Sequence, residues 1–283
     1  MTDISEPGFF RAGQRSSKDK GGSSMCRQYA AGIDLGSTCA KTVVLDEDGK
    51  IIRRDLRPTG WSSVDTALAI QKDLEKTGIC KENTVFAATG YGRISVPFAD
   101  RCVTEISCHA KGAVSLFKAS DLNVIDIGGQ DTKLIVIENG GVSEFVMNDK
   151  CSAGTGRFLE VMANTLSVTP EDLCSMASSG SGTHISSLCT VFAESEVINL
   201  IGRGTKRENI AYAVVDSIVQ KVRTQAGKIR LGEGPLCLTG GLCDFPYITE
   251  MLGNAFGRKV LTDPDARFAG AIGAALYAGA HRS

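Results

Sequence analysis

Two aspartates in this sequence are each followed by a glycine-containing turn, and each stands at the end of an apolar segment. Asp34 lies in Gly-Ile-Asp-Leu-Gly-Ser-Thr, and Asp126 lies in Val-Ile-Asp-Ile-Gly-Gly-Gln. Backbone N–H groups and hydroxyls in such turns can surround a phosphate, and the carboxylate can hold a magnesium ion through water. Two clamps of this kind facing one another would grip a polyphosphate from both sides.

The second loop carries further residues suited to an attack on a phosphate. Gly128 and Gly129 let the backbone approach an anion closely. Gln130 and Asp131 stand within reach of a metal ion or an attacking water. Taken alone, either loop is explained as well by a hairpin turn with a solvated aspartate, because hairpin turns favour the same residues. The candidate catalytic residues are Asp34, Asp126, Gln130 and Asp131.

A third glycine turn, Leu-Thr-Gly-Gly, follows another apolar segment and precedes a predicted helix. Because two adjacent glycines carry no side chains, a flat nucleoside can lie against their backbone while the helix covers it. A plain strand-to-helix turn explains the pair equally well, but its position after two phosphate loops favours a nucleotide. The candidate nucleotide-binding residues are Gly36, Ser37, Thr38, Lys41, Gly128, Gly129, Gly240 and Gly241. The sequence contains neither a Walker A loop nor a Rossmann fingerprint.

The elements that position these loops alternate between strands and helices. Each aspartate loop joins two apolar strands, and a further glycine turn leads to a third strand, so we interpret the repeated unit as an internal duplication. Chance resemblance between two common turns is the alternative. Apolar residues spaced three and four apart predict helices at 64–77, 105–117, 155–166, 170–177, 192–201, 210–229 and 266–280. We therefore expect an α/β fold with two lobes facing a cleft.

The predicted lobes cover residues 29–120 and 121–283, after a polar leader at 1–28 that is either disordered or an artificial extension. The formal net charge of the 283 residues is -1, which gives no reason to expect a nucleic-acid partner. We find no apolar run near the roughly 18 residues needed to span a bilayer and no secretory signal pattern. A cytoplasmic protein without membrane contacts is the expectation.

Seven stretches resemble one family: GIDLGST, ATGYGR, EISCHAKGA, VIDIGGQDTKLI, MNDKCSAGTGRFLEVMA, CTVFAESEVI and LTGG. The order of the three turns resembles that of the actin, Hsp70 and sugar-kinase superfamily. Within it, the stretches resemble the activators of 2-hydroxyacyl-CoA dehydratases and the ATPase subunits of benzoyl-CoA reductase. The resemblance covers residues 30–280, which is nearly everything outside the leader.

The resemblance implies an actin-like ATPase fold of two duplicated ribonuclease H-like lobes around a cleft for MgATP or MgADP. It also implies a homodimer, or a heterodimer with a related ATPase subunit, that shares one 4Fe-4S cluster. The family's cluster ligands match Cys151 and Cys189. Hydrolysis would drive a low-potential electron, supplied by a donor such as ferredoxin or flavodoxin, into a dehydratase or reductase that contains iron-sulfur clusters.

The physical setting of these two cysteines suits ligation, although a structural thiol is the alternative at each position. Cys151 precedes a predicted helix in Cys-Ser-Ala-Gly-Thr-Gly, and Cys189 precedes another, with Thr190 as a possible cap. The positive end of a helix favours a thiolate and an anionic cluster. None of the ten cysteines forms a C-x-x-C pair, so a compact zinc site is not expected within one chain. A two-fold dimer would supply the four thiolates that a 4Fe-4S cluster needs.

Other polar residues receive weaker assignments. Glu194 and Glu196 are either solvated helix charges or groups that couple the nucleotide state to the cluster, and neither His109 nor His184 is assigned a catalytic role. The cysteines assigned to packing are Cys39, Cys80, Cys102, Cys108, Cys174, Cys237 and Cys243. Two other activities are considered for the same scaffold: a small-molecule kinase such as a sugar kinase, and a nucleotide-dependent regulator without catalysis.

Overall fold

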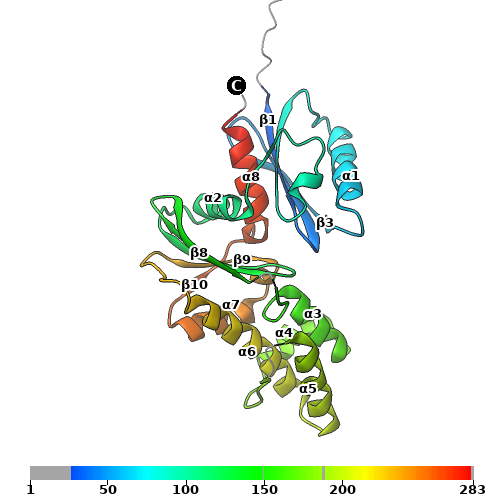
Figure 1. The fold of residues 1–283 in the computed structure, drawn as a ribbon, viewed down its shortest axis with the longest axis vertical. Coiled ribbons are helices and arrows are strands. Elements are labelled where there is room, and N and C mark those ends of the chain that lie inside the picture. Colours follow the sequence, from blue (N-terminus) through cyan, green and yellow to red (C-terminus); the bar gives the residue numbers. More distant parts are fainter. Residues whose placement is uncertain (1–26, 149, 187–188, 282–283) are drawn as a thin grey trace, which may run out of the picture.

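The protein consists of two stacked lobes, each built on a five-stranded sheet (Figure 1). The structure is a computed structural model that describes residues 27–148, 150–186 and 189–281. In the first sheet the strands are β1 (Tyr29–Leu35), β2 (Cys39–Leu45), β3 (Ile51–Pro58), β4 (Thr84–Thr89) and β5 (Arg101–Cys102). In the second they are β6 (Leu122–Ile127), β7 (Thr132–Glu138), β8 (Gly141–Asn148), β9 (Leu236–Gly240) and β10 (Val260–Leu261).

The two sheets have the same topology. The first has the order β3-β2-β1-β4-β5, and the second has the matching order β8-β7-β6-β9-β10. In each, the central strand pairs antiparallel with the next strand of the chain and parallel with a strand reached by a crossover. The central strands are buried along almost their whole length, as their apolar sequences require. The predicted α/β fold of two duplicated lobes is confirmed.

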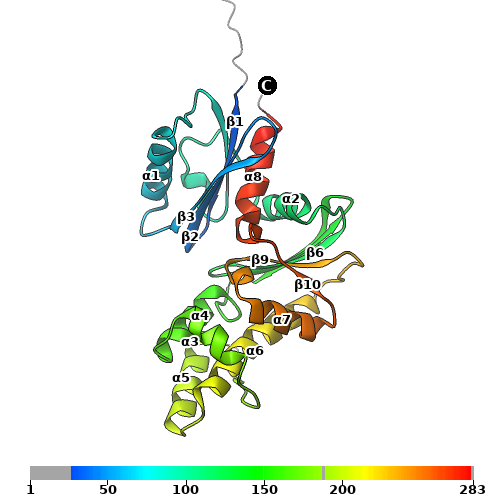
Figure 2. The same cartoon turned by 180° about the vertical axis from the view of Figure 1, so that it is seen from behind.

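Helices cover the sheets and fill the space between them. Helix α1 (Ser63–Glu75) covers one face of the first sheet, while α2 (Glu105–Phe117) and α8 (Ala269–Gly279) lie between the two sheets (Figure 2). The remaining helices lie beyond the far face of the second sheet: α3 (Gly156–Thr165), α4 (Pro170–Ala177), α5 (Thr190–Gly202), α6 (Arg207–Ala226) and α7 (Pro246–Phe256). The helix predicted at 266–280 begins instead with a short 3-10 turn at Ala266–Phe268.

The two helices between the sheets are packed unusually closely, because glycines stand where they touch. A Cβ atom on Gly112 of α2 would lie 1.9 Å from the carbonyl oxygen of Ala269, and one on Gly273 of α8 would lie 1.8 Å from that of Cys108. Helix α8 buries its alanines against the first sheet although it ends the chain. The C-terminal segment therefore ties the two lobes together, and the predicted division at residue 120 stays a prediction.

Two of the sequence-based expectations concern the leader and the membrane. The predicted leader, residues 1–28, lies outside the described residues except for its last two. Within the described ranges, we find no helix that is both long enough and apolar enough to cross a membrane.

Gly273→Ala tests the contact between α2 and α8. The added methyl group meets backbone atoms that cannot rotate away, so we expect a loss of about 1–3 kcal/mol in the free energy of unfolding, measured by urea denaturation. Gly227→Ala is the matched control, because Gly227 follows α6 with an ordinary helical φ and its Cβ would meet no atom closer than 3.5 Å. Equal stability of the two variants would contradict the close packing described above.

Candidate nucleotide site between the lobes

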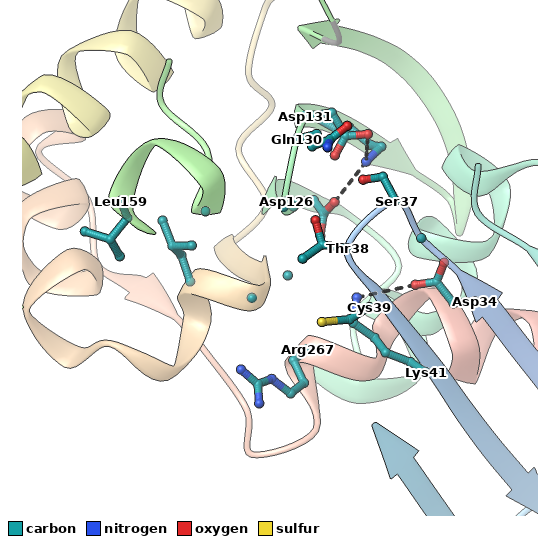
Figure 3. A pocket seen from close by; sticks show the side chains of 18 of the residues that line it. Asp34, Ser37, Thr38, Cys39, Lys41, Asp126, Gln130, Asp131, Leu159 and Arg267 are labelled. Atoms are coloured by element: carbon teal, nitrogen blue, oxygen red, sulfur yellow. Dashed lines mark hydrogen bonds and ion pairs between the residues drawn. The ribbon is translucent and has the colours of Figure 1, made fainter. Parts of the chain in front are cut away.

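A cavity of about 370 Å³ lies between the two lobes, within the size range of small-molecule sites. Its walls include every residue that the sequence predicts for catalysis and nucleotide binding: Asp34, Gly36, Ser37, Thr38, Lys41, Asp126, Gly128, Gly129, Gln130, Asp131, Gly240 and Gly241. Figure 3 shows the side chains of the two aspartate loops gathered around this space. The structure therefore brings together three turns that are far apart in sequence, while the role of each residue remains a proposal.

The first loop, between β1 and β2, is held by neighbouring backbone. The Gly36 N–H donates to the carbonyl of Cys39 at 3.1 Å, which closes the turn. Thr59, just after β3, donates its hydroxyl to the Gly36 carbonyl at 2.7 Å and its N–H to the Thr38 carbonyl at 2.9 Å. These bonds satisfy the carbonyl groups of the loop and fix its shape, leaving the Ser37 and Thr38 hydroxyls at the cavity wall.

The second loop, between β6 and β7, repeats the same turn. The Gly128 N–H donates to the carbonyl of Asp131 at 2.9 Å, as Gly36 does to Cys39. A Cβ on Gly129 would lie 2.2 Å from Oγ1 of Thr38, so the two loops touch across the cleft only because this residue is glycine. Two glycine turns thus face one another at contact distance, which is the arrangement that the predicted phosphate clamp requires.

The third turn follows β9 and borders the same cavity. Gly240 has φ +84°, a conformation that favours glycine, and a Cβ there would lie 2.3 Å from the carbonyl oxygen of Ile127. Gly241 borders open space, and Leu242 and Phe245 continue the wall beside it. This apolar stretch next to bare backbone suits a flat ring system, as expected for the nucleoside end of a nucleotide.

Each aspartate faces a lysine on the neighbouring strand. Asp34 and Lys41 are register partners, with 3.5 Å between carboxylate and ammonium, and Asp126 and Lys133 are partners at 3.3 Å. Burial opposes the ionisation of Asp126, but the charges of His109, Lys133 and Lys41 outweigh it and hold the Asp126 pKa well below its usual range. Both lysines keep their charge, because nearby carboxylates outweigh burial and raise the pKa of each.

Several polar residues of the cavity wall are not predicted by the sequence interpretation, and three of them lie close to Asp126: Glu105, His109 and Lys133. The sequence gives His109 no catalytic role, yet it is buried on α2 with Nδ1 3.4 Å from Oδ1 of Asp126. His184 lies elsewhere, with an exposed side chain 3.6 Å from Asp216. The sequence could have indicated Lys133, since the spacing Asp-x6-Lys occurs in both loops. It could not have indicated Glu105, because the position of Glu105 in the cavity depends on where α2 packs.

The residues present fit a magnesium nucleotide. Two buried carboxylates face a cavity that also presents backbone turns and the Lys41 ammonium, and this donor set matches the needs of a polyphosphate and its cation. Asp126 is further oriented by the hydroxyl of Thr239, which donates to its Oδ1 at 2.9 Å. A bound Mg²⁺ would neutralise phosphate charge at this position.

The two candidate ligand cysteines lie at neighbouring helix entrances. Cys189 is exposed and forms the N-cap position of α5, while the half-buried Cys151 lies shortly before α3. The residues that follow them are joined, because the hydroxyls of Ser152 and Thr190 are 2.9 Å apart. No group of three or more potential metal ligands occurs among the residues that the structure describes. Two thiols fit half of a four-thiolate site.

The other cysteines differ in their surroundings. Burial raises the pKa of four thiols to about 12, so they stay protonated as expected for packing residues: Cys108, Cys174, Cys237 and Cys243. The packing assignment is wrong for Cys102, which is exposed, and incomplete for Cys39, which lines the cavity. Cys26 lies outside the described residues.

Hydrogen bonds join the second phosphate loop directly to α3. The N–H groups of Gly156 and Arg157 donate to the carbonyls of Gly128 and Gly129 at 2.9 and 2.8 Å. In addition, the buried hydroxyl of Thr132 donates to the Gly154 carbonyl at 3.0 Å. Since the first N–H groups of a helix lack partners within it, the loop supplies the cap of this helix. The segment that carries Cys151 is thereby fastened to the nucleotide cavity.

The two glutamates near Cys189 make different contacts. Thr165 at the end of α3 donates its hydroxyl to Glu194 at 3.3 Å, and Glu194 therefore connects α3 with α5. Glu196 accepts from the backbone and hydroxyl of Ser186 at 3.1 to 3.3 Å, which holds the segment before Cys189. Each of the two glutamates therefore has a hydrogen-bond partner near the cysteines, and its role in coupling the nucleotide to the cluster stays a prediction.

The chain is similar in sequence to several known proteins. The (R)-2-hydroxyglutaryl-CoA dehydratase activating ATPase of Acidaminococcus fermentans is 42% identical over 253 residues, covering 88% of this chain and 96% of that protein. The activator of lactoyl-CoA dehydratase of Anaerotignum propionicum is 40% identical over 253 residues, covering 88% and 97%. A benzoyl-CoA reductase subunit of Thauera aromatica is more distant, at 28% over 266 residues, covering 87% and 92%.

Solved structures agree in fold. The activator of the 2-hydroxyisocaproyl-CoA dehydratase from Clostridium difficile, with bound ADPNP, has a TM-score of 0.83 at 34% identity, covering 90% of this chain and 95% of that chain. A ROK family glucokinase from Streptomyces griseus shares the fold alone, with a TM-score of 0.55 at 14% identity over 88% of this chain and 98% of that chain. The model of the BadF/BadG/BcrA/BcrD ATPase family matches residues 31–278, and the chain belongs to this family.

Proposed function

We propose that this chain is an ATP-dependent activator that passes a low-potential electron to a 2-hydroxyacyl-CoA dehydratase. The relatives named as activators of such dehydratases support this class of partner. The observation that carries the proposal is the direct hydrogen bonding between the second phosphate loop and the helix that follows Cys151. A kinase would not need its phosphate loop fastened to the helix that follows a candidate cluster ligand, whereas an ATP-driven electron donor would.

The proposed hydrolysis relies on positioning and charge. Asp34 and Asp126 would hold the magnesium ion, Lys41 would contact the phosphates, and Gln130 or Asp131 would orient water for attack on the γ-phosphorus. The water oxygen forms a bond to phosphorus as the bond to the leaving ADP oxygen breaks, and the products are ADP and phosphate. All of these side chains stand at the cavity wall.

The proposed redox centre is a 4Fe-4S cluster held by Cys151 and Cys189 of two copies. Such a cluster would take up one electron from a reduced donor such as ferredoxin or flavodoxin and release it to the dehydratase. The exposed apolar residues of α5 support a partner copy beside Cys189: Val191, Phe192, Ile198 and Ile201. Val191 and Phe192 stand in the first turn of this helix, close to its N-cap Cys189, and are 66% and 67% exposed.

The coupling between the two sites runs through the chain itself. A change at the γ-phosphate position would move the Gly128 and Gly129 carbonyls, and the N-terminus of α3 would follow because it donates to both. The bond between Ser152 and Thr190 would carry this movement to α5. Both candidate ligands thus belong to segments whose position depends on the phosphate loop.

The proposal is tested by mixing anaerobically purified protein, dithionite and an oxidised 2-hydroxyacyl-CoA dehydratase. We expect the dehydratase to be reduced with ATP but not with ADPNP, because the γ-phosphate must leave the site to complete the movement of the phosphate loop. Visible and EPR spectroscopy monitor the reduction. Equal reduction with both nucleotides, or none with either, would remove the electron-donor function. Phosphorylation of a sugar without any iron in the protein would instead favour a kinase.

Cys151→Ala and Cys189→Ala test the redox centre. We expect each variant to lose the iron and the visible absorption of the anaerobically purified protein, because each change removes two of four thiolates from a shared cluster. ATP binding should remain, since neither residue lines the cavity. Cys102→Ala is the matched control, because Cys102 is exposed but distant in sequence from both helix entrances. A variant that keeps its full iron content would show that the residue is not a ligand.

Thr132→Val tests the coupling, because it removes the hydroxyl bonded to the Gly154 carbonyl while keeping the shape of the side chain. We expect a cost of about 1–3 kcal/mol in stability, ATP hydrolysis within about threefold of normal, and fewer electrons transferred per ATP. The ratio of dehydratase reduction to phosphate release measures this. Thr224→Val, which removes a bond to the Gln220 carbonyl on the surface of α6, should leave the ratio unchanged. An unchanged ratio in Thr132→Val would exclude this link.

A further inference from the structure

Each lobe carries an aspartate and a lysine at matched positions of its first two strands. Lys41 lies opposite Asp34, and Lys133 lies opposite Asp126. Directly opposed residues of antiparallel strands project from the same face of the sheet. The duplication therefore puts one ammonium group beside the aspartate of each loop, and the surroundings of the two ammonium groups decide what each can do.

Lys41 is placed to contact a ligand. Among the described residues its ammonium group forms an ion pair with one carboxylate, that of Asp34 at 3.5 Å, and its side chain is 15% exposed at the cavity wall. An ammonium group has three N–H donors. Lys41 therefore has donors to spare for a phosphate.

Lys133 is placed differently, because its side chain is only 1% exposed and three carboxylates surround it. Its Nζ lies 2.8 Å from Asp131, 2.9 Å from Glu105 and 3.3 Å from Asp126. These contacts match the three donors of the ammonium group in number. Lys133 therefore has little left to offer a nucleotide, although it borders the same cavity.

The three carboxylates come from three separate segments. Asp126 lies near the end of β6, Asp131 lies in the loop before β7, and Glu105 begins α2, the helix packed between the two sheets. Without a cation between them, three carboxylates this close would repel one another and move apart. Glu105 lines the cavity together with both aspartates, so its position relative to them matters for the reaction.

We propose that Lys133 is a positioning residue for ATP hydrolysis, which holds Asp131 and Glu105 at a fixed separation beside Asp126. Glu105 is thereby a second carboxylate, besides Asp131, that can accept a hydrogen bond from the attacking water. The duplicated lysines divide the work: Lys41 contacts the phosphates and Lys133 arranges the carboxylates. The inference rests on the proposed ATPase mechanism and adds two residues to it.

Lys133→Met separates this role from nucleotide binding. Because misplacement of reacting groups costs rate rather than affinity, we expect kcat to fall by about tenfold or more, with the Kd for ATP changed by less than about threefold. Lys41→Met should show the opposite pattern, with a weaker Kd. Lys76→Met removes an exposed lysine of the first lobe that pairs only on the surface, and it should match the wild type in both measurements. The rate of wild-type hydrolysis, measured alongside, tests the ATPase function separately.

Glu105→Gln is the second variant, and it keeps the proposal testable if Lys133→Met does not fold. We expect Glu105→Gln to fold, because Lys133 stays paired with Asp126 and Asp131. We expect the same loss of kcat at an unchanged Kd, and in the double variant a loss smaller than the product of the single losses, since both act through one ion pair. A kcat within twofold of wild type in Glu105→Gln would overturn the proposal. So would a loss that appears only as weaker ATP binding in Lys133→Met.

Discussion

The ion pairs between opposed strands are the constraint on which the cavity depends. Charged groups in a nearly dry site cost several kcal/mol each unless they are paired and hydrogen-bonded. Asp126 and Lys133 meet this condition only because β6 and β7 hold them in register, with Thr239 on β9 adding a hydroxyl. The cavity therefore depends on the register of the sheet, since a shift of one residue would turn the lysine to the opposite face.

Much of the site follows from local sequence, because its main parts are turns at the ends of strands. Apolar segments, an aspartate at their end and small residues after it are enough to predict both phosphate loops and their strands. The duplication is visible in the same way, and the structure extends it to Thr89-Gly90 and Thr239-Gly240, where a Cβ on either glycine would approach the aspartate of its own lobe. These features are set by neighbours in sequence and in the sheet.

Other parts cannot be predicted locally because they depend on packing between distant segments. Glu105 reaches the cavity only because α2 lies between the sheets, and that placement depends on Gly112 and Gly273 allowing the helices to touch. Cys39 lies beside an apolar segment, as a packing residue would, but it begins β2 at the edge of the cavity. The start of α8 three residues later than predicted reflects the short turn that brings Arg267 to the cavity wall.

The surroundings of the cysteines favour a second copy for two independent reasons. Within one chain the two candidate ligands would fill only half of the proposed four-thiolate site, and α5 exposes apolar side chains to water in its first turn, close to Cys189. The first reason is a shortage of thiolate ligands and the second is exposed apolar surface, and neither implies the other. A two-fold partner placed against the start of α5 would correct both at once, because an isologous interface brings the same thiols and the same apolar residues from each side. It would also place the proposed shared cluster beside α3 and α5 of each copy. The nucleotide of each copy could then act on the cluster through its own second phosphate loop.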